Sequence, residues 1–311
     1  QFPNLRIEPN YVEGKDWGRG MSVPLKAPLS DLEFIKLGSM IQESVQLTNL
    51  TVNLQRDAPQ AFYDSLANST HIEKLNLGLD WDERSNEEDQ EQAILSNLLS
   101  GEGGNGVVER LLRNPQSQLC TLVTCCEYLE DHHLISIAQL LPTSHVEMVW
   151  FSSSRIGRTG LLEFARQLPN MNSLDTCTLF SNLLENSADH EAREECGAAL
   201  LHGLVENPSI RCLVGWQTFP QYPLFCHYLA LNVAGRKVLT LSQEQAIPCG
   251  LWANILARAG HSIDRETYGY PGVVKRARYD RLFAASLGNY VYNDPANAVY
   301  FFLQNCPKLF S

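Results

Sequence analysis

The chain has 311 residues, of which 44% are hydrophobic and 19% are charged, so it holds enough apolar material for a substantial core. Its 35 acidic and 24 basic residues give a formal charge of −11, and such an acidic surface argues against general nucleic-acid binding because it repels phosphate groups. No apolar run reaches the roughly 18 residues that a membrane-spanning helix needs.

The nine cysteines are an odd number and are scattered among apolar stretches rather than spaced as a disulfide framework. In a chain of this length we interpret them as reduced, mostly buried thiols, which favours an intracellular compartment. The first residue is Gln1 rather than Met, so removal of a targeting segment is kept as an alternative. The expected location is therefore the cytosol, or an organelle if a targeting segment was removed.

Residues 1–29 show no helical or strand periodicity over any length. They are punctuated by Pro3, Pro9, Gly14, Gly18, Gly20 and Pro24. We interpret this stretch as an extended N-terminal arm or cap, since the first unit of a stacked array needs a cover for its open core edge.

Between residues 30 and 220 a strand-like pattern recurs six times, with apolar anchors followed by a polar residue. The six segments are Leu47, Leu50, Val52 and Gln55; Ile72, Leu75, Leu77 and Asp80; Leu119, Leu122, Thr124 and Glu127; Val146, Val149, Phe151 and Ser154; Leu174, Cys177, Leu179 and Asn182; and Ile210, Leu213, Gly215 and Thr218. Repeats of this kind indicate stacked structural units.

Each segment predicts a short strand, because inward anchors such as Val149 and Phe151 alternate with outward residues. The polar residue three positions later is expected to hydrogen-bond exposed backbone where the chain leaves the sheet. The following residues have helical spacing, as in Leu161, Phe164 and Leu168. A strand, a helix and a return to a parallel strand give a right-handed crossover, and neighbouring units must stack to bury a core.

This pattern resembles the leucine-rich repeats of the ribonuclease-inhibitor-like class over about residues 30–220. The resemblance implies a curved α/β solenoid, with a parallel sheet inside and helices outside. The anchors Leu122, Val149 and Cys177 are 27 and then 28 residues apart. However, Thr124, Cys177 and Gly215 depart from the leucine consensus, so we expect an irregular array. The alternative is an ordinary α/β domain with leucines spaced by chance.

The interval from Leu75 to Leu122 is 47 residues, which is far longer than one repeat. It contains the acidic run Asp80–Glu91 and the glycine-rich stretch Gly101–Gly106. The interval holds either a second helical turn or a skipped, poorly conforming repeat, and its glycine-rich part predicts a flexible surface loop. A second acidic insertion lies near Glu185–Glu195.

After Pro220 the repeat is lost, and residues 221–311 are predicted to form a helical C-terminal cap. Helical patterns cover Leu224–Leu239, Gly250–Ala259 and Pro295–Gln304. Segments 231–236, 251–256 and 299–303 are similar to the C-terminal tail of a group of algal leucine-rich-repeat proteins of unassigned role. The chain has one basic cluster, formed by Lys275, Arg276, Arg278 and Arg281, which is either a solvated helix face or a secondary docking patch for an acidic partner.

Two stretches partly resemble metal sites. Cys125-Cys126 followed by His132-His133 has metal-ligating residue types, but adjacent cysteines on a strand point to opposite faces, so one site rarely uses both. The run Asp80–Glu91 partly mimics a calcium loop, but Arg84 occupies a position that normally supplies a ligand, and Ser85 replaces the glycine needed for the turn. We predict no metal and no cofactor.

No sequence motif indicates catalysis. The chain has no Gly-x-Ser-x-Gly elbow, and its glycine-rich stretch lacks the Lys-Ser/Thr ending of a phosphate loop. We therefore predict no catalytic residue and a protein that is not an enzyme. A hydrolase hidden in the C-terminal region, with Cys249 or a serine as nucleophile, stays an alternative because catalytic groups can assemble from distant positions.

The outward strand positions give a candidate partner-binding surface on the concave face. The last three strands present Met148, Trp150, Phe180, Val214 and Trp216 there, whereas the first three present mostly small polar groups. Neighbouring strands lie about 4.8 Å apart, so these side chains are expected to form one patch. Exposed aromatic patches usually mark an interface. The patch is covered either by a partner or by the chain's own termini.

The leading hypothesis is a non-catalytic protein-binding scaffold or accessory subunit of a larger assembly, with a protein partner of unknown identity. The resemblance also leaves open an enzyme inhibitor that acts by occlusion. A substrate receptor of a ubiquitin ligase is a further alternative. It usually carries an adaptor-binding helical motif before the repeats, and residues 1–29 show none.

Overall fold

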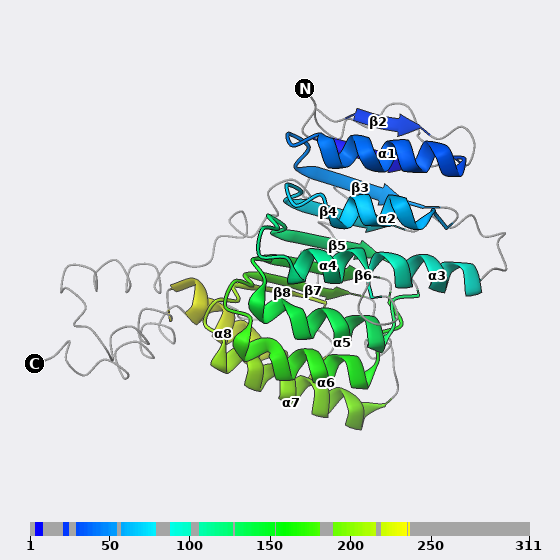
Figure 1. Cartoon of the computed structure of the whole chain (residues 1–311). Coiled ribbons are helices and arrows are strands. Elements are labelled where there is room, and N and C mark those ends of the chain that lie inside the picture. The colour runs from blue at the N-terminus through cyan, green and yellow to red at the C-terminus, as the bar shows by residue number, and fades with distance from the viewer. Residues whose placement is uncertain are drawn as a thin grey trace, which may run out of the picture.

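The computed structural model describes residues 4–8, 21–24, 29–54, 57–78, 88–100, 106–126, 128–152, 154–180, 189–215, 219–234 and 236. These residues form one eight-stranded parallel sheet, and a row of helices lies along one side of it (Figure 1). The fold is therefore α/β with alternating strands and helices, as the sequence predicts.

Six strands correspond to the six repeat segments, and each begins two residues after the first anchor of its segment. They are β3 (Asn49–Asn53), β4 (Lys74–Gly78), β5 (Thr121–Cys125), β6 (Met148–Ser152), β7 (Thr176–Phe180) and β8 (Cys212–Val214). Every neighbouring pair is parallel and in register, so Leu122, Val149, Cys177 and Leu213 lie side by side. The predicted stacking of one unit on the next is confirmed.

The helices follow the strands in chain order. They are α1 (Asp31–Glu43), α2 (Gln60–Ala67), α3 (Glu88–Leu98), α4 (Val107–Arg113), α5 (Asp131–Leu140), α6 (Arg158–Gln167), α7 (His190–Glu206) and α8 (Tyr222–Ala234). The short 3-10 helices η1 (Leu141–Thr143) and η2 (Leu168–Asn170) continue α5 and α6. Prolines at their first turn favour this tightening, because they lack the N–H that an α-helix would use.

The core is a continuous layer between the sheet and the helix row. Val149 and Phe151 of β6 are fully buried, and so are Leu161, Phe164 and Leu168 on the facing side of the next helix and its 3-10 turn. No single unit buries these side chains alone, since each strand and helix also contacts those of the adjacent units. Burying one such side chain contributes about 1.5–3 kcal/mol, which explains why the apolar anchors define the array.

Main-chain hydrogen bonds join successive units in a repeated way. The carbonyl oxygen just before a strand accepts from two consecutive N–H groups at the start of the next strand. The acceptors are Thr48, Glu73, Cys120, Glu147 and Asp175, with distances from 2.8 to 3.1 Å. Because only backbone atoms take part, this link does not depend on which side chain occupies the position.

Residues 1–29 differ from the sequence interpretation, which recognised no strand there. The chain forms β1 (Asn4–Glu8) and β2 (Met21–Pro24), which extend the sheet in the order β2-β1-β3. Each strand has only five or four residues, too few for alternation to stand out between prolines and glycines. The domain boundaries at residues 29 and 220 stay a prediction.

The long interval between β4 and β5 holds two helices, α3 and α4, and no additional strand among its described residues. The acidic stretch 80–87 and the glycine-rich stretch 101–105 lie outside the described residues. Gly106 begins α4 as its N-cap, and a Cβ there would lie 2.5 Å from the Leu99 carbonyl group. The chain therefore needs glycine where α3 ends against α4.

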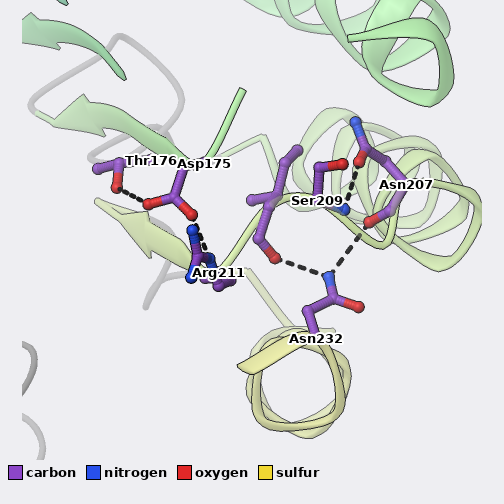
Figure 2. A network of polar contacts seen from close by, with 7 residues as sticks. Asp175, Thr176, Asn207, Ser209, Arg211 and Asn232 are labelled. Atoms are coloured by element: carbon purple, nitrogen blue, oxygen red, sulfur yellow. Dashed lines mark hydrogen bonds and ion pairs between the residues drawn. The ribbon is translucent and has the colours of Figure 1, made fainter. Parts of the chain in front are cut away.

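The C-terminal part begins with α8, which overlaps the helix predicted over Leu224–Leu239. The other two predicted helices, over residues 250–259 and 295–304, lie outside the described residues. Helix α8 packs against α7, and the amide of Asn232 donates to the carbonyl oxygens of Asn207 (3.1 Å) and Ile210 (2.6 Å) (Figure 2). The first helix of the cap is thus bonded directly to the last turn of the array.

After each strand, the polar residue was predicted to hydrogen-bond exposed backbone. This prediction is wrong for Ser154, whose hydroxyl oxygen is buried and has no hydrogen-bond partner in the described part. Gln55, Asp80, Glu127, Asn182 and Thr218 lie outside the described residues. Side-chain amides instead bond backbone at the opposite ends of the strands. There the Asn207 amide donates to the carbonyl oxygens of Leu168 (2.7 Å) and Met171 (3.0 Å).

Candidate protein-binding face

The outward positions of β3 to β8 are aligned in rows across the sheet by the strand register, and we call this surface the strand face. One row contains Asn49, Lys74, Thr121, Met148, Thr176 and Cys212, and the next contains Thr51, Asn76, Val123, Trp150, Thr178 and Val214. A third row contains Asn53, Gly78, Cys125, Ser152 and Phe180. Parallel pairing without a bulge produces these rows, because corresponding residues of all units stay aligned.

Exposure changes along the strand face. From Asn49 on β3 to Ser152 on β6, the outward side chains that the structure describes are half-buried or exposed. On β7 and β8, by contrast, Thr176, Thr178 and Val214 are only 7%, 0% and 6% exposed. These three face away from the helix-side core, so other parts of the chain cover them. The accessible part of the strand face therefore lies mainly on β3 to β6, although Cys212 on β8 is half-buried as well.

The strand face carries almost no charge. Lys74 is the only charged residue at its positions, although the chain has 35 acidic residues. Depletion of charged residues is a property of the central part of protein–protein interfaces. Glu73 and Glu147 are exposed immediately before β4 and β6, at the edge of this face. At the same edge, Arg211 forms an ion pair with Asp175 (Figure 2).

The structure aligns some of the predicted binding residues. Met148 and Trp150 both lie on β6 and are half-buried. Val214 shares the row of Trp150 but lies two strands away, about 10 Å at the usual strand spacing, with Thr178 between them. Phe180 ends β7 opposite Ser152. Trp216 and the basic residues Lys275, Arg276, Arg278 and Arg281 lie outside the described residues.

No family model matches the chain, and no curated protein matches it. Twelve chains of solved structures match, among them the leiomodin-1 actin-binding site 2, at 13% sequence identity and a TM-score of 0.38. That match covers 70% of this chain and 98% of the leiomodin chain. The description of the fold as leucine-rich-repeat-like follows from the strand register and helix row themselves.

Three of the cysteines that the sequence analysis interpreted as buried, reduced thiols have surroundings that make them unreactive. Burial raises the pKa of Cys177 well above its ordinary value, that of Cys212 to about 12 and that of Cys196 to about 11. These thiols are protonated at neutral pH and therefore poor nucleophiles and poor metal ligands. Cys126 is also buried and is not in a disulfide.

His133 has a structural contact that the sequence did not reveal. It is fully buried, and its Nδ1 accepts a hydrogen bond of 3.2 Å from the N–H of Glu130 at the start of α5. Burial, together with the neighbouring His132, lowers the pKa of His133 to about 3, so the ring is neutral at physiological pH. The sequence does not distinguish His133 from the adjacent His132. Only the packing of α5 determines that the His133 ring is buried while the His132 ring is exposed.

Within the described ranges, no group of three or more histidine, cysteine, aspartate or glutamate side chains is arranged to hold a metal ion. None of the helices that the structure describes is long and apolar enough to cross a membrane.

Proposed function

We propose that this chain is a non-catalytic scaffold or accessory subunit that binds a protein partner through the accessible part of its strand face. The observation that carries the proposal is a half-exposed apolar pair, Met148 and Trp150, within a face that contains no carboxylate. Tryptophan on a surface poor in charge is a frequent hot spot, since it buries a large area at little cost in side-chain entropy.

The polar residues beside this pair support the same function. Thr51, Asn76 and Thr121 supply hydroxyl and amide groups that both donate and accept hydrogen bonds. They lie on three successive strands next to β6 and stay accessible to a partner. An apolar anchor surrounded by neutral polar groups is the usual composition of a protein-binding surface.

Finer assignments belong to this proposal as well. They are the ribonuclease-inhibitor-like class, the similarity of the tail to algal leucine-rich-repeat proteins, the part of Phe180 and Trp216 in binding, and docking of an acidic partner on Lys275, Arg276, Arg278 and Arg281. Because Val214 is 6% exposed, it contributes to binding only if its cover moves away.

The test is affinity purification from the native source with the wild-type chain, with Trp150→Ala and with Met148→Ala, followed by cross-linking mass spectrometry on the recovered partner. Leu224→Ala is the matched control, because Leu224 is an exposed apolar residue on α8 and does not occupy a strand-face position. We expect both strand-face variants to reduce recovery of one specific protein at least tenfold while the control retains it. Thermal melting verifies that each variant is folded.

The result that contradicts the proposal is equal recovery by folded Trp150→Ala and wild type, or cross-links that map only to the helix row. The recovered partner also separates the alternatives. A partner enzyme that loses activity on stoichiometric binding indicates an inhibitor, and co-purification of ubiquitin-ligase subunits indicates a substrate receptor. Labelling of Cys249 by an activity probe would favour the hydrolase alternative.

A further inference from the structure

Exposed apolar residues in the described part of the chain are concentrated at its N-terminal end. Of the six large hydrophobic residues that are exposed there, four belong to α1 or the turn after it. They are Leu32 (61% exposed), Ile35 (37%), Met40 (61%) and Val45 (71%). Single exposed apolar residues are common, but a group of this kind usually marks an interaction surface.

Helix α1 has two distinct faces. Phe34, Gly38 and Ile41 point into the core, where Phe34 packs against Phe62 of α2. The opposite face is formed by a stripe of residues at helical spacing, which we call the α1 stripe. It consists of Leu32, Lys36, Ser39, Met40 and Glu43, and all five are exposed. The apolar members of the stripe therefore contribute nothing to the core of this chain.

The charges of the α1 stripe have no ion-pair partner within the described residues. Glu33, the acid nearest Lys36 in sequence, is occupied by the N-cap, since its carboxylate accepts hydrogen bonds from the N–H (2.8 Å) and hydroxyl (2.7 Å) of Ser30. These two bonds lower the pKa of Glu33. Lys36 and Glu43 are both exposed, and they lie seven residues apart, two turns of helix.

From this arrangement we propose that the α1 stripe binds the α1 stripe of a second copy of this chain, with the two helices antiparallel. A two-fold axis between Ser39 and Met40 places Lys36 opposite Glu43 of the second copy, because both lie equally far from that axis. The same axis puts the Met40 side chains together at the centre, beside the small Ser39.

The order of chemical types along the α1 stripe is what selects a second copy as the occupant. Lys36 and Glu43 lie equally far on either side of the central pair Ser39 and Met40, so reversing the direction of the helix exchanges the two charges and keeps this pair at the centre. An isologous interface requires this kind of self-complementarity. One helix pair buries less than the about 800 Å² per partner of a standard interface, so we expect a weak dimer, with a dissociation constant on the order of 10 µM.

Sedimentation velocity on the full chain, from about 1 to about 200 µM, tests the proposal. Wild type should dimerise across this range, and Met40→Glu should stay monomeric because it places two carboxylates on the axis. Lys36→Glu should raise the dissociation constant about tenfold, since two ion pairs become two repulsive pairs. Combining Lys36→Glu with Glu43→Lys should restore association close to wild type.

Gln42→Glu is the matched control, because it adds the same charge at an exposed position of α1 outside the stripe. A wild-type chain that is monomeric at every concentration would overturn the proposal, and so would dimerisation that Met40→Glu leaves intact. Failure of the double exchange to restore association would overturn the antiparallel arrangement. The changed side chains are all exposed, and circular dichroism confirms that each variant keeps its fold.

Discussion

The link between the array and helix α8 gives a quantitative prediction about stability. The amide nitrogen of Asn232, a residue that is 4% exposed, donates to the carbonyl oxygens of Asn207 and Ile210 (Figure 2). Its amide oxygen accepts a bond of 2.7 Å from Nε of Arg236. Arg236 is buried as well, and its Nη2 donates to the carbonyl oxygen of Leu204 at 2.8 Å. Asn232→Ala removes the centre of this network without adding bulk.

The magnitude follows from the groups that lose a partner. The carbonyl oxygen of Asn207 still accepts from Arg236 at 3.3 Å, but the Ile210 carbonyl and the Arg236 Nε–H lose the bonds that Asn232 supplied. Each buried polar group left without a hydrogen bond costs about 1–3 kcal/mol. We therefore expect Asn232→Ala to lower the free energy of unfolding by about 3 kcal/mol.

Urea unfolding followed by circular dichroism measures this loss, with Asn172→Ala as the control. Asn172 is exposed and makes only a 3.4 Å bond to the carbonyl oxygen of Asn170, so its removal should cost less than about 0.5 kcal/mol. Hydrogen exchange should show that protection is lost first in α8. A cost below about 1 kcal/mol for Asn232→Ala, or a loss of protection spread evenly over the array, would refute the argument.

Three further changes test other parts of the structure. Phe164→Ala should cost about 3–5 kcal/mol in urea unfolding because this ring is fully buried in the shared core, and a cost below about 1 kcal/mol would contradict that packing. Thr124→Val should stabilise by about 1 kcal/mol in thermal melting, since the buried Thr124 hydroxyl has no hydrogen-bond partner in the described part; a lower melting temperature would show that it has one. In the unfolded chain His133 takes up a proton below pH 6.5, whereas in the folded chain it does so only below about pH 3. As the pH falls between these values, the free energy of unfolding therefore decreases by about 1.4 kcal/mol per pH unit because of this histidine. His133→Gln should therefore lose less stability than wild type between pH 7 and pH 5, and parallel pH profiles would contradict this sign.

The anchors were predictable because they have a single environment. Leu122 and Val149 are both buried in the core, so the repeat that relates them in the sequence also makes them neighbours on adjacent strands of the fold. The register of all six strands followed from that spacing. Even the departure at Cys177 fitted, since its buried thiol occupies an anchor position as a small apolar side chain.

Other features depend on contacts between distant segments, which spacing does not encode. The strands Asn4–Glu8 and Met21–Pro24 acquire their conformation by pairing with each other and with β3, not from local alternation. Likewise, Asn207 looks like an ordinary residue before a proline, yet its amide bonds two carbonyl groups of the preceding unit. Its partners, Leu168 and Met171, are identified only by how the units stack.

The candidate site was predictable to a similar extent. Alternation alone placed Met148 and Trp150 on the outward side of β6, and the rows across the sheet follow from register. Exposure did not follow, because Thr178 and Val214 have the same alternation but are buried by parts of the chain other than their own strands. Periodicity indicates which face a side chain occupies, whereas tertiary structure decides whether that face meets solvent.

The repeated main-chain link explains how such an irregular sequence keeps a regular sheet. Thr48, Cys120 and Glu147 have different side chains, yet each carbonyl oxygen makes the same two bonds to the next unit. Packing restricts the residue type at inward positions, and the linking positions contribute only backbone atoms. Neither requirement restricts the residue type at the outward positions, which are therefore free to vary. A surface whose side chains can change without disturbing register suits recognition of one specific partner, and on this chain it carries Met148 and Trp150 among neutral polar groups.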